Sequence, residues 1–251
     1  MQAAPAAAIA KERSMLGKHT LLLGLFALFP FGVAAQSAGN DAVKAAEPPA
    51  ASAAIVAPTT EERVFDITRD GNKIGTQIVD ITRDGDETTV KFKTHIEVEI
   101  MFVVVHRFDH IATEIWNGGK FVSYKAFTKE NSDVNKLTAV AKGDKIALTV
   151  NGEEKDVDGN LVFASFWKPD FVGQKALLHP DTGHELAVEV ADLGDDTITL
   201  KDGSSVKARH YKISGDIERD LWFDGDNLIR IKLFGSDHST IVSELTSAKT
   251  N

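Results

Sequence analysis

Two histidines, His106 and His110, lie four positions apart, a spacing that suits zinc binding when both residues belong to one helix. The residues around them alternate as in a strand, however, and a separation of four in a strand places the two rings on one face but roughly 13 Å apart. The remaining histidines, among them His179 and His238, show no ligand spacing. We therefore expect no metal site and no cofactor.

The sequence also lacks the patterns of an activated nucleophile or a phosphate-binding loop. Neither Ser165 nor Ser236 stands in a Gly-x-Ser-x-Gly segment. The Asp-Gly and Gly-Asp pairs mark turns, and none opens a phosphate-binding helix. No catalytic residue can be nominated, and we predict that the protein is not an enzyme. Catalysis is the third-ranked hypothesis and is favoured only if His106 or His110 lies close to a carboxylate inside a pocket.

The aromatic side chains are more informative, because they fall at predicted strand ends or in the segment 160–178. Two interpretations are open: the rings fill the core beneath that segment, or several of them line a concave apolar site between the segment and a sheet. At such a site Lys168, Arg209 and Arg230 are candidates to hold an acidic headgroup. The candidate ligand-lining residues are Trp116, Phe166, Trp167, Phe171, Tyr211 and Trp222.

The elements that would position these residues read as antiparallel strands. Ile229, Ile231 and Leu233 fall on one face of a strand, while Arg230 and Lys232 fall on the other, which is the period of a half-buried sheet. An Asp-Gly pair just before this strand predicts a two-residue hairpin. Similar alternating segments, separated by Asp-Gly, Asn-Gly or Gly-Asp pairs, run along most of the chain.

Three stretches add detail to this strand pattern. The segment 88–99 alternates, whereas 100–105 is apolar at every position, which predicts a strand buried on both faces. The pentapeptide Ile-Thr-Arg-Asp-Gly occurs at 67–71 and again at 81–85, and each copy is expected to end a strand and enter a turn. Gly75 predicts a bulge or a close backbone approach at the start of the second strand.

Only the segment 160–178 breaks the strand pattern. Asn160 is a candidate N-cap and Pro169-Asp170 a candidate second helix start. A helical insert in a meander usually covers an open sheet face or the mouth of a barrel. The predicted fold class is therefore all-β dominated: a curved antiparallel meander that forms a half-open barrel, with one or two short helices inserted at about residues 160–178.

The N-terminal residues have the pattern of a secretory signal peptide. A short positive segment precedes the apolar run 20–33, and Val33-Ala34-Ala35 is a small-residue cleavage site. We assign residues 1–35 to a signal peptide, with Met15 as an alternative start, because the apolar run is shorter than the about 20 residues of a membrane span. An uncleaved anchor is the weaker alternative. Residues 36–62, rich in Ala and Pro, predict a disordered tether, and residues 63–247 predict a single β-barrel-like domain.

Charge and cysteine content restrict the partners. The net charge is −9, and residues 1–35 carry three Lys or Arg and one Glu, so their removal takes away +2 and leaves −11. That balance argues against nucleic acid and against broad contact with anionic lipid. The sequence has no cysteine, which excludes disulfides, thiolate metal sites and a lipidated cysteine. We expect a periplasmic (or secreted) protein with no stable membrane span after signal cleavage.

Short motifs are spread over nearly all of the segment 64–245. They are G-x-x-I-G at 71–75, E-x-W-x-x-G-K at 114–120, S-x-W at 165–167, A-x-x-Y-x-I-x-G at 208–215 and L-W-[FY]-D at 221–224. With these motifs the chain resembles a family of uncharacterised secreted proteobacterial proteins. The resemblance implies an architecture similar to the incomplete antiparallel barrel of the periplasmic lipoprotein-carrier proteins, in which helices close a curved sheet over an apolar cavity. It implies no catalytic residue, and Phe223 stands where the pattern usually has Tyr.

These features lead to one functional hypothesis and one alternative. A secretory address, a single β domain and an aromatic-rich insert favour a periplasmic or secreted non-enzymatic protein that binds a hydrophobic ligand, such as a lipid or an acyl chain. The alternative is a structural or interaction module of the cell envelope that docks a protein partner.

Overall fold

The computed structural model describes residues 57–250. The expected signal peptide, 1–35, and most of the expected tether, 36–62, lie outside the described residues. The first strand begins at Thr59, inside the range assigned to the tether, and the last strand ends at Thr250.

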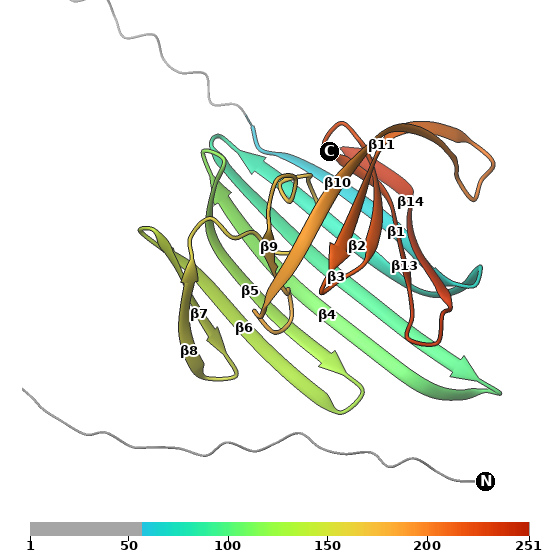
Figure 1. Cartoon of the computed structure of the whole chain (residues 1–251), viewed down its shortest axis with the longest axis horizontal. Helices are drawn as coiled ribbons and strands as arrows, with labels where there is room; N and C mark the ends of the chain where they lie inside the picture. Colours follow the sequence, from blue (N-terminus) through green and yellow to red (C-terminus); the bar gives the residue numbers. More distant parts are fainter. Residues whose placement is uncertain (1–56, 251) are drawn as a thin grey trace, which may run out of the picture. The chain divides into compact units, whose positions relative to one another are not determined.

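All regular secondary structure in the described residues is β-strand (Figure 1). The strands are β1 (Thr59–Arg69), β2 (Asn72–Asp84), β3 (Glu87–Ile100), β4 (Val103–Asn117), β5 (Lys120–Glu130), β6 (Asp133–Lys142), β7 (Lys145–Val150), β8 (Glu153–Asp158), β9 (Ala176–Leu178), β10 (Glu185–Thr199), β11 (Ser205–Gly215), β12 (Arg219–Asp224), β13 (Asn227–Phe234) and β14 (Thr240–Thr250). They form one 14-stranded antiparallel sheet in the order β8-β7-β6-β5-β4-β3-β2-β1-β14-β13-β12-β11-β10-β9.

The sheet consists of two meanders joined by the pairing of the first strand with the last one. From β1 the hairpins run to β8, and from β14 they run back to β9. The sheet curves, so that β10 to β13 cross in front of β2 to β4 in Figure 1. It does not close, because β8 and β9 are the two terminal strands of the order. The predicted open, antiparallel meander is thus confirmed.

The predicted helices are wrong. The segment 159–175, which joins the two terminal strands, contains turns and no helix, and residues 57–250 contain no helix that could cross a membrane. The backbone explains this result. Phe166 has φ +54° and Gly173 has φ +82°, neither of which fits a right-handed helix, and Pro169 lies between them. No uninterrupted stretch remains that is long enough for a stable helix.

The segment 159–175, which we call the plug, covers part of the concave side of the sheet. Its buried residues are Leu161, Phe163, Phe166, Trp167 and Phe171, all in the main hydrophobic core. The ring of Phe163 stacks on Tyr124 of β5 with centroids 4.0 Å apart. Backbone bonds from the Ala164 amide to the Leu178 carbonyl and from the Leu178 amide to the Val162 carbonyl tie the plug to β9. The plug therefore covers the sheet face that the predicted helices were expected to cover.

The prediction for residues 100–105 is also wrong. These residues do not form a strand buried on both faces; they make the end of the β3–β4 hairpin, and Met101 to Val105 are all exposed. An uninterrupted apolar run has the same pattern in a doubly covered strand and in an uncovered hairpin end, so periodicity alone could not separate the two.

One glycine and one β-bulge determine how neighbouring strands pair locally. A Cβ on Gly75 would lie 2.2 Å from the His95 carbonyl oxygen, so the predicted close approach is confirmed. In β13 the register shifts opposite Trp222 and Phe223. Ile229 consequently packs with Trp222 in a small cluster separate from the main core, whereas Ile231 packs against the main core. The predicted common face of Ile229 and Ile231 is thus interrupted by a bulge.

The core role of the plug predicts a sharp contrast between two adjacent residues. Phe171 is fully buried and Val172 is exposed. Phe171→Ala should lower the free energy of unfolding by about 3–5 kcal/mol because it leaves a cavity, whereas Val172→Ala should change it by less than about 0.5 kcal/mol. Urea denaturation measures both values. Similar small effects of the two substitutions would show that the plug is not part of the core.

Candidate functional site

A cavity of about 310 Å³, the inner pocket, occupies the part of the concave face that the plug leaves open. Most of its wall is apolar, from β1, β3, β4, β13, β14 and the plug. The apolar lining residues are Ile67, Phe92, Ile96, Phe108, Ala164, Phe166, Pro180, Ile231, Leu233 and Ile241. The polar lining residues are Gln77, Thr94, His110, Tyr124, Ser165, Asp181, Arg219 and Ser243. A few polar groups in an apolar concavity are the usual composition of a small-ligand site.

Three of these polar side chains form a row across adjacent strands together with Thr128. Gln77, Thr94, His110 and Thr128 are successive register partners on β2, β3, β4 and β5. The Gln77 amide nitrogen donates to the Thr94 hydroxyl at 3.2 Å, and His110 Nδ1 lies 2.8 Å from the Thr128 hydroxyl. We call these four residues the polar row. Thr94 lies between Phe92 and Ile96, and His110 between Phe108 and Ala112, on the same face of their strands, so the row interrupts an apolar surface.

The polar row ends at a carboxylate. Asp181, from the loop after β9, has Oδ1 at 2.9 Å from His110 Nδ1 and accepts a hydrogen bond of 3.1 Å from the Thr128 hydroxyl. Burial raises the pKa of Asp181, but the hydrogen bond and charge of His110, aided by His179 and Thr128, outweigh burial and hold that pKa below its ordinary value. Asp181 is therefore an anion that orients the imidazole of His110.

Tyr124 lies on the other side of the same imidazole. Its hydroxyl is 3.5 Å from His110 Nε2. Burial, together with the negative charges of Glu114 and Asp181, raises the pKa of Tyr124 well above its ordinary value. The phenol therefore stays protonated and can act as a hydrogen-bond donor, while it is a poor nucleophile.

Arg219, at the start of β12, contributes a cation to the inner pocket. Burial lowers its pKa, although a guanidinium remains charged at neutral pH. Its Nη1 donates to the Glu218 carbonyl at 3.0 Å, and no carboxylate of residues 57–250 lies within ion-pair distance of it. The hydroxyl of Ser243, which also lines the pocket, is buried and has no partner in the described structure. The pocket therefore offers unused capacity to bind a polar group.

A second buried polar group lies directly beside the inner pocket. Glu114 is directly opposite Tyr124 in the sheet and is 1% exposed. Its Oε1 accepts hydrogen bonds from the indole nitrogens of Trp116 at 2.7 Å and Trp167 at 3.3 Å. The ammonium of Lys168 lies 3.3 Å above the centroid of the Trp116 ring. Burial raises the pKa of Glu114, which the hydrogen bonds and Lys168 only partly offset.

Asp170 completes this cluster from the plug. Its Oδ2 lies 3.7 Å from the Lys168 ammonium. Burial and the nearby Glu114 raise the pKa of Asp170 to about 7, against the opposing effect of Lys168. The Trp167–Glu114 hydrogen bond and the Lys168 contact with the Trp116 ring hold the plug against β4, and Asp170 pairs with that lysine from within the plug.

The structure separates the six residues that the sequence nominated as ligand-lining. Trp116, Phe166, Trp167 and Phe171 are buried in the main core, and Tyr211 packs against that core. Of these five, Phe166 lines the inner pocket. Trp222 lies in the separate small cluster, and its indole nitrogen donates to Asp196 at 3.1 Å.

The three nominated cations already have partners. Lys168 contacts Asp170, Arg209 pairs with Asp192 and Asp195, and Arg230 pairs with Glu244. None of them lines the inner pocket. The residue in that position is Arg219, which the sequence did not single out because Glu-Arg-Asp looks like an exposed charged turn.

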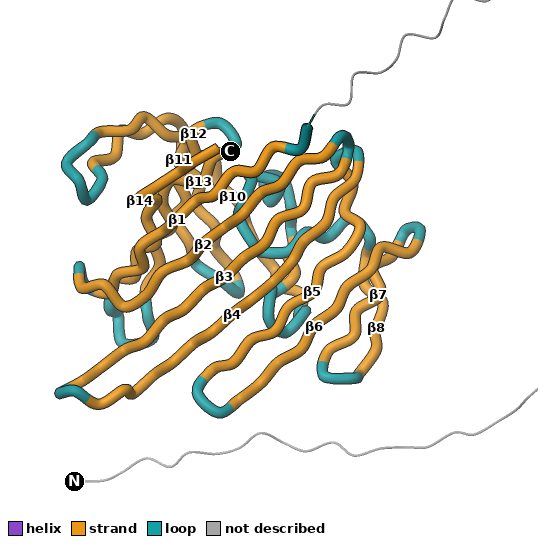
Figure 2. Tube along the Cα trace, turned by 180° about the vertical axis from the view of Figure 1, so that it is seen from behind, coloured by secondary structure: helices purple, strands orange, loops and turns teal. Residues whose placement is uncertain are grey.

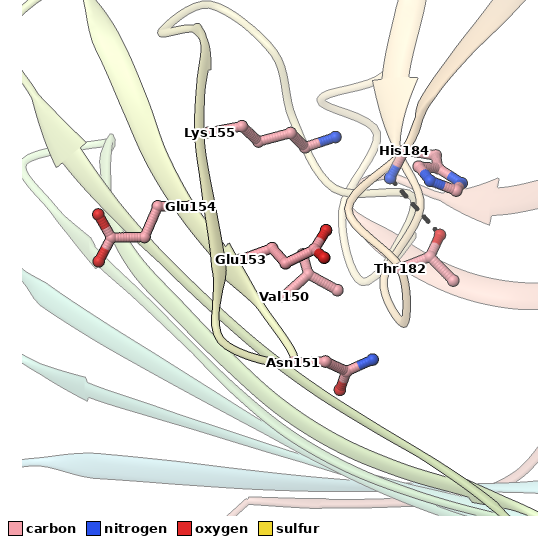
Figure 3. A pocket seen from close by; sticks show the side chains of 7 residues that line it. All are labelled: Val150, Asn151, Glu153, Glu154, Lys155, Thr182 and His184. Carbon is pink, nitrogen blue, oxygen red and sulfur yellow. Dashed lines mark hydrogen bonds between the residues drawn. The ribbon is translucent and has the colours of Figure 1, made fainter. Parts of the chain in front are cut away.

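Other hollows lie outside the inner pocket. One of about 660 Å³ has two of the nominated residues, Trp222 and Arg230, in its wall. Another of about 350 Å³ lies between the β7–β8 hairpin and the loop 182–184, with Glu153, Glu154 and Lys155 at its side (Figure 3). These three side chains are exposed, and in Figure 3 Glu154 points away from the other residues. Among residues 57–250, no group of three or more His, Asp or Glu side chains is arranged to hold a metal ion.

The raised pKa of Asp170 predicts how stability changes with pH. The folded protein keeps this proton up to about pH 7, whereas the ordinary pKa is 3.8, so the contribution of Asp170 to stability is complete at low pH and is lost as the pH rises through 7. Asp170→Asn, which is neutral throughout, should become more stable relative to wild type between pH 4 and 8. Melting temperatures across this range measure the difference. Asp156→Asn on exposed β8 controls for removing a carboxylate, and a constant difference for Asp170→Asn would contradict the assignment.

A search of curated proteins found no relative that matches this sequence. The fold is similar to a crystal structure of a beta-barrel-like protein of the domain of unknown function DUF1849 from Brucella abortus. The TM-score is 0.56, with 11% sequence identity over 77% of this chain and 98% of that chain. At this identity the likeness concerns the fold alone. The family described as a domain of unknown function, DUF6134, matches residues 65–246, which extend from β1 to β14, and the chain therefore belongs to this family.

Proposed function

We propose that the protein binds an amphipathic ligand, an acyl chain with an anionic end group, in the inner pocket, and that it does so in the periplasm or outside the cell. The observation that carries the proposal is Arg219, a mostly buried guanidinium that faces an apolar cavity without a carboxylate partner among residues 57–250. A buried charge is costly unless an opposite charge accompanies it. An anionic ligand would supply that charge.

The remainder of the pocket suits the apolar part of such a ligand. Its wall is formed mainly by aliphatic and aromatic side chains from both halves of the curved sheet. A volume of about 310 Å³ lies at the lower end of the range for small-ligand sites. An alkyl chain would gain roughly 0.8 kcal/mol for each buried methylene.

The polar row and Ser243 would recognise the polar end of the ligand. His110, held by Asp181, and Tyr124 provide donors next to an apolar wall. The unpartnered hydroxyl of Ser243 provides a further donor or acceptor. A carboxylate or phosphate end group would satisfy these groups together with Arg219.

The fold supports this proposal in a general way. An open, curved antiparallel sheet around partly apolar space is what the resemblance to lipoprotein-carrier proteins implies, although a helix-free plug stands in place of the covering helices. The secretory address predicted for residues 1–35 is part of the same proposal and is consistent with an envelope ligand.

A displacement assay with a dansyl-labelled undecanoic acid tests the proposal. Wild type should bind this probe saturably, and palmitic acid should displace it. Arg219→Gln should weaken binding of the acid by about 10–100-fold, because a charge-assisted hydrogen bond contributes about 1.5–3 kcal/mol. The same substitution should leave binding of the corresponding long-chain alcohol nearly unchanged.

Arg209→Gln provides the matched control. It removes the same charge from an exposed position outside the inner pocket, so affinity for the acid should not change. Lack of saturable binding by wild type, or equal losses in the two variants, would exclude Arg219 as the residue that recognises the acid.

One observation favours a second candidate function, that of a hydrolase or another enzyme using general acid–base catalysis. His110 lies in a pocket and is oriented by a carboxylate at 2.9 Å, as a catalytic base would be. The neighbour of its other ring nitrogen is, however, the protonated phenol of Tyr124. The hydroxyl in contact with Nδ1, that of Thr128, donates its proton to Asp181 and not to the imidazole.

Hydrolysis of p-nitrophenyl acyl esters distinguishes the two candidates. The binding proposal predicts no turnover above the rate in buffer. An acid–base enzyme would instead show saturable turnover that His110→Gln lowers at least 100-fold, which is the usual effect of removing a general base.

A further inference from the structure

The β3–β4 hairpin ends in an uninterrupted set of exposed apolar side chains. Met101 is 89% exposed, Phe102 100%, Val103 61%, Val104 41% and Val105 49%. We call Met101–Val105 the hairpin tip. Large apolar side chains that are this exposed and adjacent indicate an interaction surface.

The turn chemistry of the hairpin tip is unusual within this sheet. Met101 and Phe102 are the two central residues of the turn and have φ +49° and +66°. Such positions favour Asn, Asp or Gly, and every other two-residue hairpin in the described sheet has Gly or Asn at one of them. The chain therefore places large apolar side chains where a small or polar residue would be more stable.

The hairpin tip projects beyond its neighbours. The registers of β2 and β5 with this hairpin end at Ile96 and Phe108, beyond which only Asn131 still bonds to Arg107. Ile100 lies four positions beyond Ile96, which is about 13 Å of strand. The projecting turn is visible in Figure 1 and, from behind, in Figure 2. This length is sufficient to reach the depth of about 5–10 Å at which apolar side chains enter a bilayer interface.

A ring of polar residues lies immediately behind the hairpin tip. Glu97 pairs with Arg107, His106 Nδ1 lies 3.9 Å from Glu130, and Glu99 is exposed. These groups would stay in water and so limit insertion to the hairpin tip. Their combined charge is not positive, and attraction to anionic lipid therefore does not explain the surface.

We propose that the hairpin tip inserts into the interfacial layer of a lipid bilayer and holds the protein at a membrane surface. Val103, Val104 and Val105 follow one another along the strand and therefore alternate between its faces, yet all are exposed. A protein groove would cover one face, whereas hydrocarbon surrounds both. The partner that fits is thus a lipid surface, and zwitterionic lipid is sufficient.

The hairpin tip also lies close to the inner pocket in the sheet. Ile96 and Phe108, which line that pocket, are register partners on the same hairpin. Insertion would bring this edge of the pocket within about 13 Å of the membrane surface. The membrane proposal stands on the exposed residues themselves and does not require that the pocket bind a ligand.

Site-specific fluorescence in the full chain provides the deciding test. The variant Phe102→Trp is mixed with phosphatidylcholine vesicles whose acyl chains carry bromine near the headgroup. The fluorescence of the introduced tryptophan, obtained by subtracting that of wild type, should shift to shorter wavelength and be quenched at least twofold. Leu193→Trp, at an exposed position on β10, is the matched control and should show neither change. An unshifted and unquenched tryptophan at position 102 overturns the proposal, whatever amount of protein binds through other segments.

A second variant tests whether insertion contributes to binding without disturbing the fold. Met101→Asn with Phe102→Gly introduces the dipeptide that this turn favours, so the melting temperature should stay the same or rise. The partition coefficient for phosphatidylcholine vesicles should fall at least tenfold, and adding phosphatidylglycerol should not restore it. An unchanged partition coefficient contradicts the proposal. So does a result in which neither the wild type nor the variant binds vesicles, while the wild type self-associates in solution and the variant does not.

Discussion

The structure depends on one constraint: much of the concave face of an open sheet has to be covered by the segment that joins its two terminal strands. The first strand pairs with the last, so the gap lies between β8 and β9, and the chain must cross it. The plug makes this crossing with five buried apolar residues. It needs no helix, because its backbone bonds to β9 and its turns satisfy the polar groups that a buried loop would otherwise leave unpaired.

The plug does not fill the concave face completely, and the remaining space contains the groups that carry the functional proposals. The polar row crosses four strands at positions where apolar residues would pack with less desolvation. Arg219 and Ser243 have bonding capacity that no described residue uses. Such groups lower the stability of the empty protein and become favourable when a ligand pairs with them. A ligand with an apolar part and a polar end would thus account for both the apolar wall of the pocket and the polar residues within it.

Strands and turns were predictable from local pattern, whereas the site was not. The two Ile-Thr-Arg-Asp-Gly copies enter the β1–β2 and β2–β3 turns as expected, because turn chemistry is local. The helix predicted for the plug is wrong because the interruption depends on Phe166, a residue with no sequence signal for positive φ. His110 and Asp181 meet only through tertiary structure. Inward-facing His110 and Glu114 within alternating apolar strand positions were the available signal, and the E-x-W-x-x-G-K motif contains Glu114.

Native-state hydrogen exchange tests the central claim, that the plug is part of the core on which the sheet folds. The amides of Ala164 and Leu178 are bonded to Leu178 and Val162 carbonyls. They should exchange as slowly as amides in the central β3–β4 ladder, through global unfolding. Exchange of these two amides at the rate of the exposed turn residues Ser236 and Asp237, while the ladder stays protected, would contradict the account.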